Sequence, residues 1–445
     1  MSSAITNKFR GLLLDLLKGD LDSSSPNYYI GLARADAFTA PDPINSPYAQ
    51  SQIRHSLQAV KTVSNSSFVI PTVNWENGTI YEAYDDADPD QTNFYVMDNL
   101  NQVFICIEQG KTDDGIAQPS TIEPNITGGL TFRTNDGYKW RFMYRISNLA
   151  YSNYRSEVYS PVKNMIGEQS FIQEEVFQKQ LQDNSVPGEI IGLAIDSTGT
   201  GIPSIPSISI EGNGTGAQFT CTLNNGKITR VQVDSDVDGL FRHGTGYDYA
   251  TANLSIGDAV LRPIFSPRAG LHADLQHTFK SKALMIQQDF IGDEQSTLLV
   301  ENDFSQIALF RGITQYGSDS AFTGNTGIAL KSLILNNDGL SGTFDEDAVF
   351  VNGPQTSKGK VLHFDATINK LYYWQDETTG FNAFNAGGTV TQTTGGVNAG
   401  NGQILSVINP AVDAYSGDIL YINNVSSIDR ASNQTEDIRI VIQLG

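Results

Sequence analysis

Apolar runs and alternating apolar and polar residues dominate this chain, and they predict β-strands along most of its length. Alternation places successive side chains on opposite faces of a strand. The clearest segments are Tyr28–Leu32, Phe68–Val73, Asn93–Glu108 and Tyr138–Ile146. The third of these segments is expected to be a hairpin that turns near Asp98 and Asn99. The pattern therefore predicts a protein built mainly of β-strands.

The C-terminal segment Gly417–Leu444 is expected to form a strand, a loop and a second strand. Ile419 and Tyr421 alternate with their neighbours, and a polar loop follows. Apolar residues then occupy every second position over Ile438–Ile442, so they share one face of a strand.

Helical spacing is limited to short segments. Residues 4–18 carry apolar side chains at i, i+4 and i+7, and Gly19 is a suitable stop. A second helix is expected at 53–64, with its apolar side formed by Ile53, Leu57 and Val60. A short polar segment at 169–182 is also expected to be helical.

Two stretches rich in Gly, Ser, Thr and Asn are expected to be small separate β modules. The first contains Asn225-Gly226 between alternating runs, which is the strongest short-range signal for a hairpin. The second contains a hairpin that turns at Asn369-Lys370. The fold class expected is therefore mainly β, with a layered sheet or sandwich core, a few flanking helices and two inserted modules. The predicted division is 1–183, 184–261, 262–333, 334–402 and 403–445.

Composition limits the partners. The 445-residue chain has 28 basic and 49 acidic residues, a net charge of −21, and 17% charged residues. Acidic surface repels nucleic acid and anionic membrane, so neither nucleic-acid binding nor membrane insertion is expected. The N-terminus has no secretory signal pattern, which indicates synthesis in the cytosol. Cys106 and Cys221 lie in apolar strand patterns and are expected to be free thiols.

One local pattern resembles half of a calcium-binding loop. Asp234, Asp236 and Asp238 have the spacing of the first three ligands, and Gly239 follows at the turn position. The twelfth position should be Glu but is Thr245. Two interpretations remain open: a calcium site, or an acidic turn without metal.

The other candidates for chemistry lack a defining spacing. The scattered histidines and the carboxylate cluster at 85–90 satisfy no metal-ligand rule, and Gly212–Gly216 is not followed by a phosphate-binding Lys or helix. None of the common nucleophile, zinc-protease or dinucleotide signatures occurs. We therefore expect no enzyme and no cofactor, and a structural or binding role.

Several short segments carry a more specific signal through their order along the chain. They include Thr-Ile-Glu-Pro at 121–124 and Asp-Gly-Tyr-Lys-Trp at 136–140. The others are Thr6–Arg10, Tyr29–Arg34, Val69–Trp75, Phe304–Ile307 and the C-terminal segment with Gln434–Glu436. In this order they resemble the baseplate wedge subunit, the gene product 8 family, of T-even-type contractile-tailed bacteriophages. The modules near 185–260 and 335–400 depart from that family and resemble insertions.

The resemblance implies a mainly β structural protein of the virion tail. It implies a homodimer in the baseplate that contacts other wedge proteins and takes part in the rearrangement that triggers sheath contraction. It brings no catalytic residues. Exposed apolar side chains would suit such interfaces, and the candidates are Phe9, Leu13, Tyr81 and Tyr84. The alternative for these side chains is that they fill the core of their own subunit.

Two other functions remain open. The first is a tail protein that binds carbohydrate or a host receptor through the two modules, with aromatic residues around Trp374 as the binding surface. The second is a tail-associated hydrolase that uses a pair of carboxylates.

Overall fold

The computed structural model describes residues 6–23, 27–34, 45–125, 131–165, 173–236, 239–294 and 296–444. Strands account for 44% of the chain and helices for 11%, which confirms the predicted mainly β class. The chain divides into two compact units. Unit 1 comprises residues 1–16, 67–285 and 441–445, and unit 2 comprises residues 17–66 and 286–440. The division into five segments stays a prediction.

The helices are short, and one of them differs from its prediction. They are α1 (Asn7–Leu21), α2 (Pro47–His55), α3 (Asn148–Tyr154), α4 (Gln173–Asp183) and α5 (Leu275–Thr278). The helix expected at 53–64 is wrong, because α2 ends at His55 and the strand β2 (Leu57–Thr62) follows. The segments expected at 4–18 and 169–182 correspond to α1 and α4, with residues 1–5 and 166–172 outside the described residues.

Unit 1 contains an antiparallel sheet in the order β4-β5-β7-β6. Its strands are β4 (Tyr95–Met97), β5 (Gln102–Glu108), β6 (Thr131–Arg133) and β7 (Lys139–Arg145). The predicted hairpin at 93–108 is the pair β4 and β5. Asp98 closes its turn, because its carboxylate accepts hydrogen bonds from the backbone N–H groups of Leu100 (2.9 Å) and Gln102 (2.7 Å).

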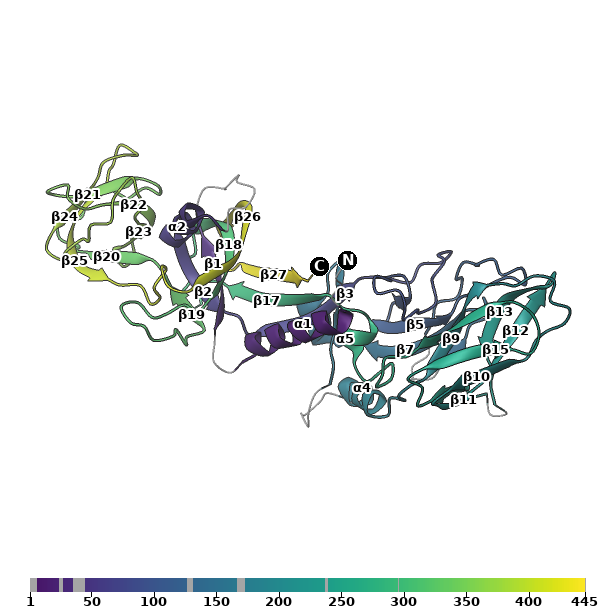
Figure 1. Cartoon of the computed structure of the whole chain (residues 1–445). Helices are drawn as coiled ribbons and strands as arrows, with labels where there is room; N and C mark the ends of the chain where they lie inside the picture. Colours follow the sequence, from purple (N-terminus) through teal and green to yellow (C-terminus); the bar gives the residue numbers. More distant parts are fainter. Residues whose placement is uncertain are drawn as a thin grey trace. The chain divides into compact units, whose positions relative to one another are not determined.

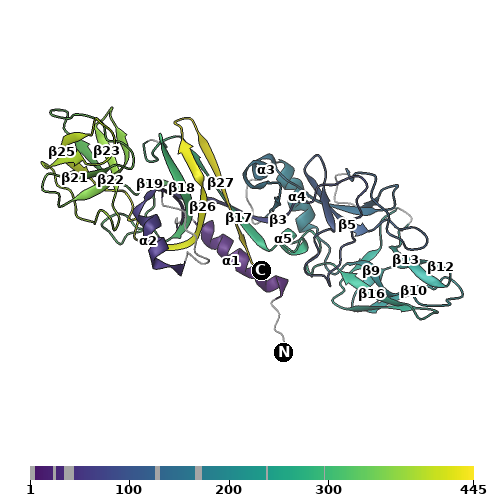
Figure 2. The same ribbon diagram turned by 90° about the horizontal axis from the view of Figure 1, so that it is seen from above.

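The segment after α4 forms a second group of strands in unit 1 (Figure 2). One sheet has the order β10-β15-β16-β9, and two strand pairs are β11-β14 and β12-β13. Their bounds are β9 (Ile190–Ser197), β10 (Ile208–Gly212), β11 (Thr215–Ala217), β12 (Phe219–Asn224), β13 (Lys227–Val233), β14 (His243–Thr245), β15 (Ala250–Leu254) and β16 (Val260–Phe265). Asn225 and Gly226 connect β12 to β13 with φ values of 50° and 72°, as the predicted tight hairpin turn requires.

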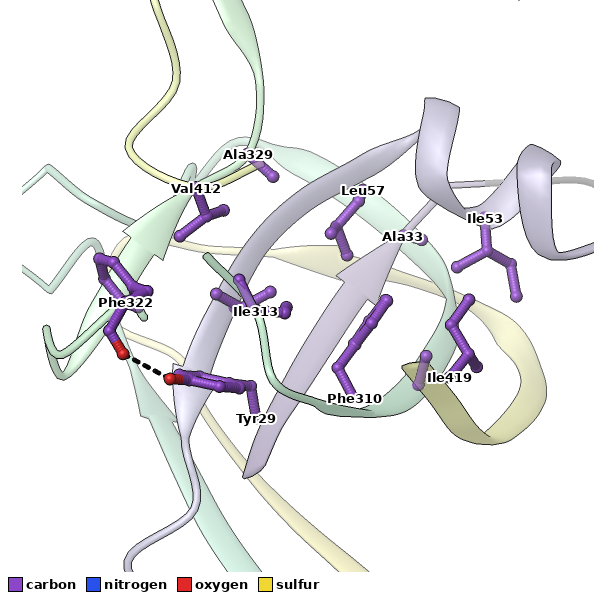
Figure 3. Close-up of a cluster of buried hydrophobic side chains, with 12 residues drawn as sticks. Tyr29, Ala33, Ile53, Leu57, Phe310, Ile313, Phe322, Ala329, Val412 and Ile419 are labelled. Atoms are coloured by element: carbon purple, nitrogen blue, oxygen red, sulfur yellow. Dashed lines mark hydrogen bonds between the residues drawn. The ribbon is translucent and has the colours of Figure 1, made fainter. Parts of the chain in front are cut away.

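Unit 2 contains a five-stranded antiparallel sheet in the order β19-β2-β1-β18-β26. The remaining bounds are β1 (Tyr28–Ala33), β18 (Asn302–Arg311), β19 (Thr326–Ile328) and β26 (Asp418–Arg430). Figure 3 shows the apolar cluster on this sheet, in which Tyr29, Phe310 and Ile313 are fully buried. The hydroxyl of Tyr29 donates a hydrogen bond to the carbonyl of Phe322 inside the cluster.

The rest of unit 2 includes a closed six-stranded barrel, in the order β20-β23-β22-β21-β24-β25 (Figure 1). Its strands are β20 (Lys331–Leu335), β21 (Val349–Asn352), β22 (Lys358–Asp365), β23 (Lys370–Trp374), β24 (Thr389–Gln392) and β25 (Asn401–Ile408). Closure leaves no unpaired strand edge. The barrel covers more of the chain than the predicted module at 334–402, because β20 begins earlier and β25 ends later.

A further sheet has the order β27-β17-β3-β8. Its strands are β3 (Asn65–Pro71), β8 (Tyr159–Val162), β17 (Ala283–Ile291) and β27 (Thr435–Gln443). Within unit 1, Val69, Ala283 and Met285 pack into one buried cluster with Tyr154.

Candidate functional site

One side of α1 exposes four large apolar side chains. Leu14 and Leu21, seven residues apart, are buried and mark the side that faces the protein. The other side exposes large apolar side chains at helical spacing. Their exposed fractions are 50% for Phe9, 52% for Leu12, 40% for Leu13 and 63% for Leu16. Two of the predicted interface residues, Phe9 and Leu13, therefore lie on an accessible surface, which we call the α1 apolar face.

Hydrogen bonds hold α1 in place. In unit 1, the side-chain amide of Gln276 donates to the carbonyl of Gly11 (3.4 Å). In unit 2, the hydroxyl of Tyr28 donates to Asp20 (2.7 Å), and the guanidinium of Arg311 lies 3.1 Å from the same carboxylate. The exposed side chains therefore belong to an anchored helix.

A cavity of about 550 Å³ adjoins the N-terminal half of α1 in unit 1. Phe9 and Leu12 form part of its wall, together with Arg268 and His277. Apolar and charged side chains thus meet at this end of the α1 apolar face, as they do where the apolar centre of a protein interface meets its polar rim.

Tyr81 and Tyr84, the other two predicted interface residues, are buried in unit 1 with exposed fractions of 1% and 4%. The hydroxyl of Tyr81 accepts a hydrogen bond from the backbone N–H of Glu76 (2.7 Å), and burial raises the pKa of Tyr81. Burial also raises the pKa of Tyr84, and the neighbouring Asp86 adds to this shift. Both rings fill the core of their own chain, which is the alternative that the sequence left open.

Three of the segments that carry the family resemblance meet in unit 1. The carboxylate of Asp136 accepts hydrogen bonds from the backbone N–H groups of Thr121 (2.8 Å) and Ile122 (3.0 Å). The hydroxyl of Ser120 bridges this carboxylate (3.1 Å) to the indole N–H of Trp75 (3.0 Å). Burial alone would raise the pKa of Asp136, but the hydrogen bonds it accepts outweigh burial and lower it. Segments at 69–75, 121–124 and 136–140 therefore form one hydrogen-bonded junction.

Three more of these segments are adjacent strands in unit 2. Leu32 in β1 lies opposite Ile307 in β18, and Phe304 in β18 lies opposite Ile428 in β26. Segments that lie more than 100 residues apart in the sequence are thus hydrogen-bonded neighbours in one sheet.

Two of the buried carboxylates in unit 1, those of Glu108 and Glu189, face cations. Glu108 binds the ammonium of the fully buried Lys139 and the guanidinium of Arg133 (2.6 Å). Glu189 binds Arg141, with a distance of 2.7 Å between Oε2 and Nη1. Burial alone would raise the pKa of both carboxyls. The neighbouring cations outweigh burial, so both pKa values are lowered. Carboxylates held ionised in this way do not suit the proton-donor role that a glycoside hydrolase needs.

The acidic segment at 85–90 is also paired with cations in unit 1. The carboxylate of Asp85 lies 2.7 Å from the guanidinium of Arg262, and Lys282 binds Asp90. The ammonium of Lys280 donates to the backbone carbonyl of Asp85 (2.7 Å). These contacts give the acidic cluster a structural role.

The calcium candidate lies partly outside the described residues, because Asp238 is not described. The carboxylates of Asp234 and Asp236 accept hydrogen bonds from the backbone N–H groups of Ser235 and Leu240, both at 2.9 Å. Asp234 also lines a cavity with two arginines, Arg133 and Arg230. Positive charge in the cavity that Asp234 lines disfavours a divalent cation there. Among the described residues, no group of three or more potential ligands has metal-binding geometry.

The buried histidines are each hydrogen-bonded to a backbone carbonyl. Nδ1 of His243 lies 3.0 Å from the carbonyl of Ile190, and Nε2 of His272 lies 2.9 Å from that of Phe142. Burial lowers the pKa of both imidazoles to about 4, with further lowering by Arg141. They remain neutral near pH 7, which suits core residues. The thiol of Cys106 is buried, and burial raises its pKa.

A cavity of about 410 Å³ in unit 2 includes Trp374, the centre of the predicted carbohydrate surface. Sequence reasoning missed the other residues of this cavity, among them His55, Phe381 and Tyr415. They come from separate segments, so no local pattern in the sequence marks them.

The comparisons with known proteins add no assignment. No protein-family model matches the chain, and no curated protein matches it. None of the helices among the described residues is long and apolar enough to span a membrane.

Proposed function

We propose that this chain is a structural subunit of a phage tail baseplate wedge. In this role it links neighbouring wedge subunits and takes part in baseplate assembly and in the rearrangement that triggers sheath contraction. It acts as a homodimer in contact with other wedge proteins, in the virion, and it has neither a catalytic site nor a cofactor.

The observation that carries the proposal is the spatial grouping of the segments that resemble the wedge family. Chance matches would be scattered over the structure. Instead, Asp136 binds the backbone at Thr121 and Ile122, and β18 pairs with both β1 and β26. Residues of these segments contact one another, as expected if they hold together a fold that this chain shares with the wedge family.

The α1 apolar face supports an assembly role. Leaving several neighbouring apolar side chains in water is unfavourable, and burying them against a partner removes that cost. We assign the contact between the two copies of the homodimer to Phe9, Leu12, Leu13 and Leu16.

Light scattering coupled to size exclusion tests the dimer. The chain mass is 48.4 kDa, and we expect a species of about twice that mass. Replacing Leu12→Asp and Leu16→Asp together removes two side chains that are each about half exposed. Burying the exposed half of one such side chain contributes about 1 kcal/mol. Both copies of the dimer carry both changes, so four such contributions are lost, and dimerisation should weaken by about 4 kcal/mol, or roughly 1,000-fold.

A matched control separates this effect from unfolding. Leu149→Asp also places a carboxylate on an exposed leucine, in α3, where the exposed fraction is 72%. The control should remain dimeric and keep the same melting temperature. A double variant that dimerises as well as the wild type would overturn the assigned contact.

Capture of other wedge proteins tests the assembly role itself. The tagged wild-type chain and the Leu149→Asp variant should retain wedge proteins encoded by the same phage genome when these are co-expressed. Failure of both to retain any such protein would contradict the proposed function.

A further inference from the structure

The cavity that contains Trp374 lies at one end of the barrel in unit 2. Lys331 begins β20 and Trp374 ends the neighbouring antiparallel strand β23, so both residues lie at the same end. The cavity volume is about 410 Å³, and α2 contributes His55 to its wall. The mouth of a barrel is a common place for a small-molecule site, and this volume is in the usual range.

Two exposed aromatic rings line this cavity. Phe381 and Tyr415 have exposed fractions of 52% and 56%. The imidazole of His55 lies between them, with ring centroids 5.1 Å from Phe381 and 5.7 Å from Tyr415. Nδ1 of His55 lies 2.6 Å from the hydroxyl of Tyr415, and Nε2 lies 3.1 Å from the carboxylate of Glu377. These contacts hold the rings in place before a ligand arrives.

Two adjacent residues of the wall have buried polar atoms without a hydrogen-bond partner among the described residues. The amide nitrogen of Gln375 donates to the carbonyls of Lys358 (2.8 Å) and Asn382 (2.9 Å), but its Oε1 has no partner. The indole N–H of Trp374 also has none. Gln375 is 6% exposed. A hydroxyl group can satisfy either atom, since a hydroxyl both donates and accepts.

The same wall carries positive charge. Lys331 is half-buried, and its ammonium makes no ion pair or hydrogen bond with the residues that the structure describes. Burial lowers its pKa, and no neighbouring charge contributes to that shift. The guanidinium of Arg54 also lines the cavity, although it donates to the carbonyls of Ala414 (2.8 Å) and Ser416 (2.7 Å). A ligand with a carboxylate would neutralise the ammonium of Lys331.

We propose that this cavity binds an acidic sugar, a pyranose ring that carries a carboxylate, as in the uronic acid units of polysaccharides. The ring lies against Phe381 and Tyr415, hydroxyl groups pair with Gln375 and Trp374, and the carboxylate faces Lys331. The inference does not depend on the wedge proposal, because a binding site in the barrel requires nothing from the α1 apolar face.

Ligand-observed NMR and calorimetry with the full-length chain test this site. The probes are methyl glucuronide, an oligomer of glucuronic acid, and the neutral methyl glucoside. We expect the acidic probes to bind and the neutral probe to bind at least about tenfold more weakly. Phe381→Ala should weaken binding of every probe about tenfold or more. Lys331→Gln should reduce the affinity for methyl glucuronide to that for methyl glucoside.

Tyr249→Ala is the matched control, because it removes an exposed aromatic ring (66%) in unit 1. It should leave sugar binding unchanged, and the melting temperatures of all variants should agree with that of the wild type. Absence of binding up to about 10 mM for every probe would overturn the site. Equal affinity for the acidic and neutral probes would overturn the assignment to an acidic sugar. Binding that Phe381→Ala does not weaken would overturn the location.

Discussion

Replacing Glu436→Gln should destabilise the end of unit 2 far more than the loss of an exposed ion pair would. The guanidinium of Arg430 is almost fully buried, with a side-chain exposed fraction of 1%. It makes two hydrogen bonds to the carboxylate of Glu436 (3.1 and 3.0 Å), and others to the carbonyls of Leu299 (2.7 Å) and Gly292 (2.9 Å). Glu436 belongs to the Gln434–Glu436 segment that carries part of the family resemblance.

The magnitude follows from burial. Removing one partner of a buried ion pair leaves an uncompensated charge and costs about 3–5 kcal/mol. The pair formed by Lys179 and Asp183 in α4 is partly exposed, with side-chain fractions of 26% and 57%. An exposed pair contributes less than about 1 kcal/mol. Asp183→Asn is therefore the control.

Amide hydrogen exchange measured by mass spectrometry resolves the effect locally. A loss of about 3 kcal/mol raises the local opening equilibrium about 150-fold, so peptides from β26 and the start of β27 should exchange faster by that factor. Peptides from α3 should not change. Replacing both partners, Arg430→Met with Glu436→Leu, should cost less than the single change. If Glu436→Gln accelerates exchange no more than Asp183→Asn does, the reasoning about the buried pair is wrong.

Three further predictions concern unit 1. Burial lowers the pKa of His243 and His272 to about 4, below the ordinary value of 6.5, so the unfolded chain binds more protons between these values. The contribution of these two histidines to the free energy of unfolding should therefore be fully present above pH 6.5. It should fall as the pH decreases to 4, by about 1.4 kcal/mol per pH unit for each histidine. In urea unfolding measured across this pH range, His272→Gln should reduce that slope. Gly226→Ala should lower stability by about 1–2 kcal/mol, since φ is +72° and a Cβ would lie 3.1 Å from the backbone of Gly201; denaturation measures it. Calcium should produce no heat in calorimetry and no thermal shift, since Asp234 already accepts a backbone hydrogen bond; a calcium-dependent shift would restore the calcium site.

Local sequence patterns were sufficient to predict those elements whose structure is determined by neighbouring residues. The hairpin at Asn225-Gly226 follows from two residues that tolerate positive φ. In the other predicted hairpin, the side chain of Asp98 closes the turn between β4 and β5. The class of the protein follows from alternation over many segments.

The helix predicted at 53–64 failed because its evidence lies outside the segment. In β2, Gln58 and Lys61 are buried polar residues that look like the polar face of a helix. Gln58 donates to the carbonyl of Asp303 (2.6 Å), and Lys61 donates to that of Asp289 (2.6 Å) and binds Glu294. These partners are more than 200 positions away, so no window of sequence shows that a buried strand can satisfy these groups.

The polar loop expected after Ile419 and Tyr421 is also largely a strand. β26 continues to Arg430 because β18 supplies a hydrogen-bonding partner, with Ile307 opposite Asn423. β26 is the edge strand of its sheet, where polar side chains are tolerated. The sequence also could not predict the cavity around Trp374, because its wall combines residues that are distant in the sequence: α2, the barrel and the segment at 414–415.

Immunogold labelling of purified phage particles tests the proposed wedge role most directly. Antibodies raised against the barrel, residues 331–408, would be visualised by gold labelling in electron micrographs of purified particles. The wedge account predicts gold at the baseplate, in particles with extended and with contracted sheaths. Particles that carry no label, or that carry it only on the head or on fibres distant from the baseplate, would contradict the account.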